Sequence, residues 1–245
     1  SVMRCQPLRR ALYSLRLEVI EEQIKSLFKY RPVNEFTLDI IANNRIYYSK
    51  PETFNDPYDT EYFLRSSKRR HSNEHVENYD QIVNRYNERY RDIIRSTGIL
   101  SLSQADDNLL LWAHYAEDHK GICIEFERNP DNILGNDSST KPVRYTQSYP
   151  SFERHVFMSA ESSSVVHRIL WTKSKHWAYE QEWRVIVNEG DTVKPLPGKI
   201  LSITFGMRCS ERSRDIIKKL VSGTDIVLKQ ADKLANRYGI KIARI

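Results

Sequence analysis

Hydrophobic positions along the chain form two helical patterns and a series of short runs. Over residues 8–25, Leu and β-branched residues recur every three or four positions among Arg and Glu, which predicts an amphipathic helix. Residues 66–96 carry a longer and more charged version of this pattern, which predicts a peripheral helix with a solvated outer face. Asn34 is placed to cap a shorter helix that ends at Asn43 and Asn44.

Short apolar runs that stop at proline, glycine or other turn residues predict β-strands. They cover residues 26–31, 46–49, 99–103, 122–126, 143–146, 181–187, 200–205, 226–228 and 240–245. Helical and strand patterns interleave without an internal repeat or an evident linker. We therefore expect a single α+β domain over residues 1–245.

A further helix is expected over residues 109–116, between two strands. Asp106 or Asp107 can cap its start, and Gly121 can close its end. The remaining segments are expected to be helical over most of 151–174 and over 212–221, and looped over 52–59 and 129–142. The 129–142 loop is expected to be the most mobile of these, because it has the loosest composition.

Composition and charge restrict the class of protein. The 245 residues are 40% hydrophobic and 29% charged, which excludes a disordered chain and leaves ample material for a core. A net charge of +6 is compatible with nucleic-acid contact without requiring it. Neither a membrane helix nor a secretory leader is expected, because no apolar run is long enough for the first and no apolar leader core is present. The three cysteines, Cys5, Cys123 and Cys209, are far apart, which favours a reducing cytoplasm.

The densest group of reactive side chains lies in residues 173–184. If the chain is extended from Glu180, then Glu180, Glu182 and Arg184 share one face of a strand. Two carboxylates in this arrangement can align a substrate hydroxyl and stabilise a developing positive charge. The alternative is a solvated strand face whose acids pair with Arg184 and Lys175.

Two other places could carry chemistry. Asp56 and Asp59, in a turn-forming Asn-Asp-Pro loop, could face a divalent metal or a ribose, or could simply build the turn. His114 has aromatic neighbours, Trp112 among them, and is either a core histidine or a site residue. The chain has no GxSxG, GxxxxGK[ST], GxGxxG or HExxH motif, which argues against serine hydrolases, P-loop NTPases, Rossmann enzymes and zincins.

Several of these motifs occur in a familiar order. They are Phe28-Lys29-Tyr30-Arg31, Ile46-Tyr47-Tyr48-Ser49, Phe54-Asn55-Asp56-Pro57, Leu111-Trp112-Ala113-His114-Tyr115, and Trp177-Ala178-Tyr179-Glu180-Gln181-Glu182-Trp183-Arg184. In this order the chain resembles the bacterial domain-of-unknown-function family DUF2971, over about residues 27–206. The family name carries no activity, so this resemblance predicts kinship alone.

A second resemblance is to the ADP-ribosyltransferases, in the order of a first strand with Arg, a second strand ending in Ser, and a later strand opening with Glu-x-Glu. It implies a mixed, split β-sheet core flanked by helices. It also implies that Arg31 holds NAD, that Tyr48 or Ser49 supports the nicotinamide ribose, and that Glu182 bonds a ribose hydroxyl. Glu180 then orients the acceptor.

On this resemblance we expect NAD-dependent ADP-ribosyl transfer or NAD cleavage, without a metal, in a bacterial toxin or phage-defence effector. The NAD pocket is expected to include Asp56, Trp112 and His114. The acceptor, whether protein or nucleic acid, is left open.

Two other functions are also left open by the sequence. A metal-dependent nuclease would use the acids at 56, 59, 180 and 182 as ligands and Lys175 to stabilise charge. A non-catalytic nucleic-acid or protein-binding module would use the basic, tyrosine-rich stretch 68–95.

Overall fold

The structure, a computed structural model, describes residues 24–65 and 73–245, with side chains from residue 78 onward in the second range. The helix predicted over residues 8–25 lies outside this range except for its last two residues, as does Cys5. Cys123 and Cys209 are buried free thiols. Among the described residues, no helix is both long and apolar enough to cross a membrane.

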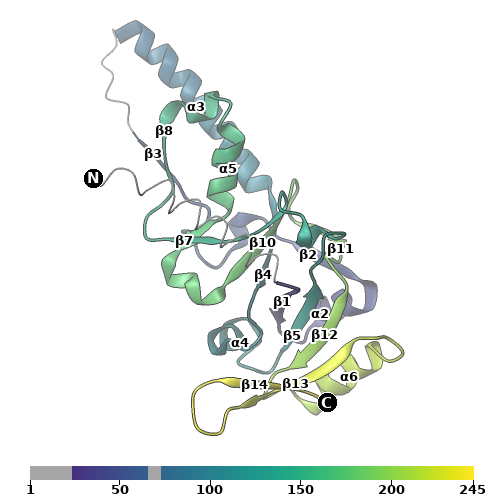
Figure 1. Cartoon of the computed structure of the whole chain (residues 1–245). Coiled ribbons are helices and arrows are strands. Elements are labelled where there is room, and N and C mark those ends of the chain that lie inside the picture. The colour runs from purple at the N-terminus through teal and green to yellow at the C-terminus, as the bar shows by residue number, and fades with distance from the viewer. Residues whose placement is uncertain (1–23, 66–72) are drawn as a thin grey trace, which may run out of the picture.

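An eight-stranded mixed sheet forms the centre of the molecule, in the order β14-β13-β12-β5-β1-β4-β10-β6 (Figure 1). Its strands are β1 (Ser26–Arg31), β4 (Gly98–Ser103), β5 (Ile122–Glu127), β6 (Thr140–Pro142), β10 (Glu182–Val187), β12 (Ile200–Phe205), β13 (Val227–Lys233) and β14 (Ile240–Arg244). The β12–β13 pair is parallel, and the other neighbours are antiparallel. The predicted α+β class with a mixed sheet is confirmed.

The sheet divides between β1 and β4. β1 pairs with β5 at all six positions, and β4 pairs with β10 at six, but β1 and β4 are in register only at Phe28 and Ser103. The two strands therefore diverge beyond that pair, and Ile99 of β4 bonds with the backbone of Ser49 in place of β1. The structure thus has a mixed sheet that opens between β1 and β4.

Shorter elements surround the sheet. Three two-stranded ribbons pair β2 (Arg45–Tyr48) with β11 (Thr192–Pro195), β3 (Phe63–Arg65) with β8 (Ser151–Glu153), and β7 (Arg144–Thr146) with β9 (Thr172–Ser174). The α-helices are α2 (Glu35–Asn43), α3 (Asn73–Ser96), α4 (Leu109–Tyr115), α5 (Ser162–Leu170) and α6 (Glu211–Leu220). Single 3₁₀ turns are η1 (Pro51–Thr53), η2 (Ile133–Gly135), η3 (Arg154–Met158) and η4 (Lys175–Glu180).

Local hydrogen bonds explain where the helices start. Asn34 caps α2 by accepting from the backbone N–H of Thr37, as predicted. The helix predicted over residues 109–116 is confirmed as α4, but its caps were wrong. Its N-cap is Asn108, which accepts from two backbone N–H groups of the first turn, and its C-cap is Ala116 rather than Gly121.

Two segments contain secondary structure other than that predicted from the sequence. Residues 151–174 are only partly helical, because β8, η3 and β9 take up much of the range alongside α5. The expected loop at 129–142 contains η2 and β6, and the Asn132 side chain caps η2 by accepting from two backbone N–H groups.

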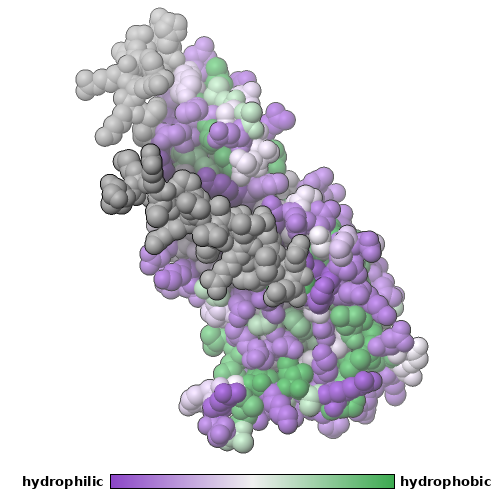
Figure 2. All heavy atoms as spheres, in the orientation of Figure 1, coloured by the Kyte–Doolittle hydropathy of each residue, from purple (hydrophilic) through white to green (hydrophobic). Residues whose placement is uncertain are grey.

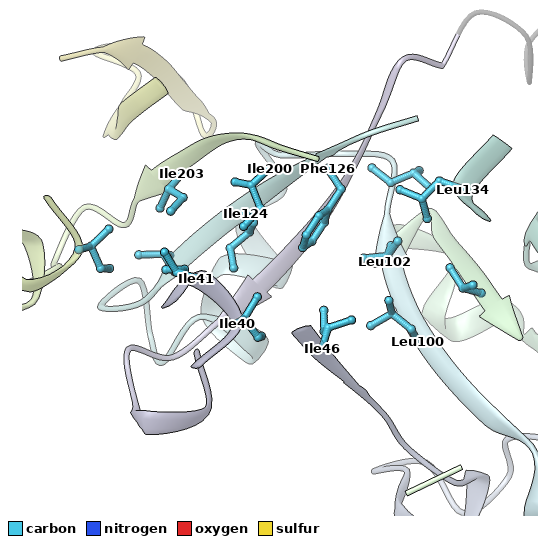
Figure 3. Packing of buried hydrophobic residues seen from close by; sticks show 14 of the residues in the cluster. Ile40, Ile41, Ile46, Leu100, Leu102, Ile124, Phe126, Leu134, Ile200 and Ile203 are labelled. Atoms are coloured by element: carbon cyan, nitrogen blue, oxygen red, sulfur yellow. The ribbon is translucent and has the colours of Figure 1, made fainter. Parts of the chain in front are cut away.

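The largest apolar cluster packs between the sheet and α2, β2 and α6. Figure 3 shows Ile40 and Ile41 of α2 and Ile46 of β2 facing Leu100, Leu102 and Ile124 of the sheet. A second cluster joins α3 and α5, and a third packs α4 against the opposite face of β1 and β5. Apolar groups on both faces thus hold the two halves of the split sheet.

The long helix α3 extends away from the sheet (Figure 1). Val83 is buried and Tyr90 stacks on Phe157 at 4.7 Å between ring centroids, but Tyr79 and Tyr86 are more than a third exposed. The sequence pattern predicts that Tyr79, Val83, Tyr86 and Tyr90 all pack on the body of the molecule, and only Val83 and Tyr90 do so. On the face shown in Figure 2, exposed hydrophobic atoms gather instead in the lower half, around α4 and α2.

Candidate functional site

A cleft of about 800 Å³ opens where β1 and β4 diverge. One wall is formed by β1 and α2, the other by β4 and the start of β10, and the loop over residues 53–59 lies across one end. Its lining combines aromatic rings with five basic and four acidic side chains, an unusual concentration of charge for a partly enclosed space.

Three carboxylates and two cations meet at the β10 end of this cleft. The Lys173 ammonium donates to Glu180 Oε2 at 2.6 Å and to Glu182 Oε2 at 3.0 Å. Arg184 donates from Nε to Glu182 Oε1 at 2.8 Å and binds both oxygens of Asp59, at 2.9 and 2.5 Å. We call these five residues the acid cluster. Their formal charges leave one net negative charge.

The acid cluster is nearly closed to solvent. The five side chains are between 0% and 7% exposed. Burial alone would raise the pKa of Glu182, but Arg184 and Lys173 lower it to about 2. Burial opposes the charge of Arg184 as well, and Glu182 and Asp59 raise its pKa above the ordinary value. The solvated strand face that the sequence offered as an alternative is therefore wrong.

Tyrosines complete the hydrogen bonding of the two glutamates. Tyr115, at the end of α4, donates from Oη to Glu180 Oε1 at 2.6 Å. Burial, and next the Glu180 carboxylate, raise the pKa of Tyr115, so it stays protonated. The Tyr145 hydroxyl accepts from the backbone N–H of Glu182 at 2.7 Å. The first bond holds the Glu180 carboxylate, and the second holds the backbone where β10 begins, before any ligand arrives.

Two basic residues of β1 form a different kind of wall. Lys29 donates to the Ser101 carbonyl of β4 at 2.7 Å, across the split. Arg31 donates from Nε to Thr37 Oγ1 at 3.2 Å. Within the described part of the chain, neither forms an ion pair with an acid, and burial followed by Arg31 lowers the pKa of Lys29 to about 8. We call Lys29 and Arg31 the basic wall.

Four of the residues predicted for the site line the cleft: Arg31, Ser49, Glu180 and Glu182. Glu180 reaches it from the last position of η4 rather than from the strand, and the left-handed Gln181 links it to β10. Trp183 lies on the opposite, core-facing side of β10, as predicted.

The other predicted pocket residues lie elsewhere. Tyr48 is 1% exposed and faces the main core, because exposed and buried positions alternate along β2. Trp112 is fully buried against Tyr30, and its indole N–H donates to the Asp106 carbonyl at 2.8 Å. His114 is exposed on α4, outside the cleft, with Nδ1 at 3.1 Å from the Tyr179 hydroxyl. These three assignments to the pocket are corrected.

Asp56 is also a structural residue rather than a cleft residue. Its Oδ2 accepts from the Trp177 indole at 2.6 Å, and its Oδ1 accepts from the backbone N–H of Tyr58. These bonds tie the loop to η4 and bring Asp59 to Arg184. The loop is thus both a turn and part of the site.

The sequence had not assigned a role to Lys29, Lys173 or Tyr115, and it had offered Asp59 to a divalent metal, to a ribose or to a turn, but not as a partner of Arg184. It also chose the wrong lysine as partner of the acids, Lys175 instead of Lys173. The expected helix over most of 151–174 hid this lysine, whereas in the structure Lys173 is the buried middle residue of β9, between Thr172 and Ser174.

The acids do not form an evident metal site. Among residues 24–65 and 73–245, no three acids, histidines or cysteines are grouped so as to hold a metal ion. The carboxylates of Asp59, Glu180 and Glu182 are bound by Lys173 and Arg184, and a divalent cation would compete with both.

Comparison with known families supports the first resemblance. The model of a family described as "Protein of unknown function (DUF2971)" matches residues 111–185, which include Tyr115, Lys173 and the Glu180–Arg184 segment. Neither a curated protein nor a solved structure matches the chain. The resemblance to DUF2971 that the sequence predicts is therefore confirmed, over residues 111–185 of this chain.

Proposed function

We propose that the cleft binds NAD and that the chain breaks the bond between nicotinamide and ribose, with transfer of ADP-ribose to an acceptor or to water. One observation carries the proposal: the cleft is charged in opposite senses at its two walls. The acid cluster has one net negative charge, while the basic wall has two cations without acid partners among the described residues.

NAD has the complementary distribution of charge. Its pyrophosphate is anionic, and its nicotinamide ring is cationic before the reaction. The Arg31 guanidinium suits a phosphate because it presents two N–H groups together, and Lys29 adds a point charge. The exposed rings of Phe36 and Tyr47 at the cleft offer surfaces for the flat ends of the molecule.

The proposed reaction places positive charge next to the acid cluster. The glycosidic bond breaks with its electron pair on the nicotinamide nitrogen, which neutralises the ring and leaves positive charge on ribose C1′ and its ring oxygen. Water or an acceptor hydroxyl then bonds C1′ and loses a proton. A fixed, buried carboxylate stabilises this transition state more than the ground state, because it is already oriented.

Between the two glutamates, Glu180 is the better stabilising group. Only one cation, Lys173, bonds its carboxylate, whereas Glu182 is bonded by both Lys173 and Arg184. We therefore give Glu180 the stabilising role and Glu182 the role of positioning Lys173 and Arg184. This reverses the division that the ADP-ribosyltransferase resemblance implied.

The bonds of the acid cluster favour this chemistry over a nuclease, because a metal would have to replace Lys173 and Arg184 as partners of the acids. We place the activity in the cytoplasm, in keeping with the cysteine usage, and a toxin or phage-defence role remains part of the proposal.

The test is release of nicotinamide from NAD by the purified full chain, with and without EDTA. We expect release that EDTA leaves unchanged and that Arg31→Gln weakens through a higher KM. Lys194→Gln, at a partly buried basic residue of β11 that does not line the cleft, is the matched control. Absence of release, or release abolished by EDTA, would overturn the proposal.

A further inference from the structure

A second hollow, of about 370 Å³, lies on the other side of β9 from the acid cluster. It is bordered by β6, β7, β9 and the end of α5. Successive residues of β9 separate the two places: Thr172 lines the hollow, while Lys173 belongs to the acid cluster. We call this hollow the basic pocket.

The lining of the basic pocket contains cations but no acid. Lys141, Arg144, His167 and Arg168 all border it, together with hydroxyl-bearing side chains. Within residues 24–65 and 73–245, none of these four takes part in an ion pair, whereas both basic side chains of the acid cluster do. Like charges that no counterion screens repel one another, so this group of basic side chains raises the electrostatic free energy of the protein unless an anion binds there.

Aromatic rings hold two of the cations in place. The Arg168 guanidinium lies 4.8 Å from the centroid of the Phe152 ring, and the Lys141 ammonium lies 5.7 Å from that of Trp171. These contacts orient the side chains while leaving their charge uncompensated. Burial, and next the charge of Lys141, lower the pKa of His167. The surroundings of the pocket therefore disfavour the protonated form of this imidazole.

The helix dipole explains the position of only two of these four basic residues. His167 and Arg168 lie in the last turn of α5, where cations are favoured in any helix. Lys141 and Arg144 come from β6 and β7, which present them to the same hollow for no such local reason. Because basic side chains from α5, β6 and β7 reach the same hollow, this arrangement indicates a binding site for an anion.

We propose that the basic pocket binds the phosphate group of an organic phosphate ester, either a nucleotide or a nucleic-acid strand. Concavity, basic side chains without an acid among them, and a hydroxyl donor at Ser148 fit a phosphate with its ester oxygen. This inference does not depend on the proposed NAD chemistry, because no residue lines both the basic pocket and the cleft.

The probe is a fluorescein-labelled oligothymidylate of about 12 nucleotides, followed by anisotropy in a salt series, with 5′-AMP and inorganic phosphate as competitors. In Arg144→Gln/Arg168→Gln we expect about a tenfold or greater loss of affinity and a salt slope reduced by about two. Lys219→Gln/Lys241→Gln removes the same charge from distant α6 and β14 and should change neither.

Each further outcome has a meaning. A strand that binds more tightly than 5′-AMP identifies a nucleic acid, and equal affinity identifies a nucleotide. Inorganic phosphate that competes as well as 5′-AMP would overturn the proposal, as would no binding or an equal loss in the control variant. If Arg31→Gln abolishes binding and the double variant does not, the anion binds in the cleft instead, and the proposal for the basic pocket fails.

Discussion

Burial and the neighbouring Arg31 lower the pKa of Lys29 to about 8, so this ammonium begins to lose its proton just above neutral pH. An anionic ligand binds the protonated form. We therefore expect KM for NAD to rise between about pH 7 and pH 9, as the charge at the basic wall falls from two to one.

The variant Lys29→Gln separates this ionisation from others. Its KM should be higher at pH 7 and nearly constant up to pH 9, because the titrating group is gone. Steady-state nicotinamide release across this range measures both. The same rise of KM with pH in Lys29→Gln would show that another group titrates.

Arg184 is the cation whose loss costs the acid cluster most. In Arg184→Met, Asp59 loses both of its hydrogen bonds from Arg184 and keeps only the Lys173 ammonium, 3.9 Å away. Glu182 likewise retains only Lys173, and both carboxylates stay buried. The free energy of unfolding should fall by about 3–5 kcal/mol, the cost of leaving one half of a buried ion pair. Urea denaturation measures it.

An exposed pair provides the control for that loss. Lys199→Met breaks the exposed pair with Asp225 and should cost less than about 1 kcal/mol. In Arg184→Met/Asp59→Asn the total loss should be smaller than the sum of the single losses, because the unpaired carboxylate is gone. A loss in Arg184→Met as small as that of the control would show that the cluster is not stabilised by these bonds.

At the scale of elements, long apolar runs were predicted well and short strands poorly. The sequence located the central strands β1, β4, β5, β10 and β12, because each carries a run of apolar residues, and all but β1 bury most of their positions. It missed β3, β8 and β11, which are three or four residues long and therefore too short to show a period. The cap of α4 was misplaced because Asp106, Asp107 and Asn108 are all good caps, and tertiary contacts decide among them.

The junction of α4, β5 and β1 yields a test of how elements shape the cleft. A Cβ atom on Gly121 would lie 2.1 Å from the carbonyl oxygen of Arg31. Gly121→Ala should therefore push apart the ends of β5 and β1, lower the free energy of unfolding by about 1–3 kcal/mol, and raise KM for NAD. Thermal unfolding and steady-state kinetics measure the two effects.

A glycine far from the cleft is the matched control. In Gly135→Ala the new Cβ would lie 2.0 Å from the Asn129 carbonyl oxygen, in η2. It should cause a similar loss of stability and leave KM unchanged. If both variants raise KM equally, the effect is general loosening and not displacement of Arg31.

At the scale of the whole molecule, the site could be predicted only in part. The Glu-x-Glu pair and Arg31 were found because each lies in a short motif of distinctive residues. Lys29, Asp59 and Lys173 were not recognised as members of one site, since more than 100 positions separate Lys173 from the other two and only the fold brings them together. The net charge of +6 likewise did not show that cations without acid partners gather at the basic wall and the basic pocket.

The most direct test of the central claim compares NAD turnover and NAD affinity in one variant. Glu180→Gln keeps the shape of the side chain and removes the charge that we propose stabilises ribose C1′. We expect kcat for nicotinamide release to fall by about 10²–10³ while Kd for NAD, from calorimetry, changes less than about threefold. The control is Glu127→Gln, an acid outside the cleft. Unchanged kcat in a folded Glu180→Gln protein, or a loss of turnover explained entirely by weaker NAD binding, would contradict the account.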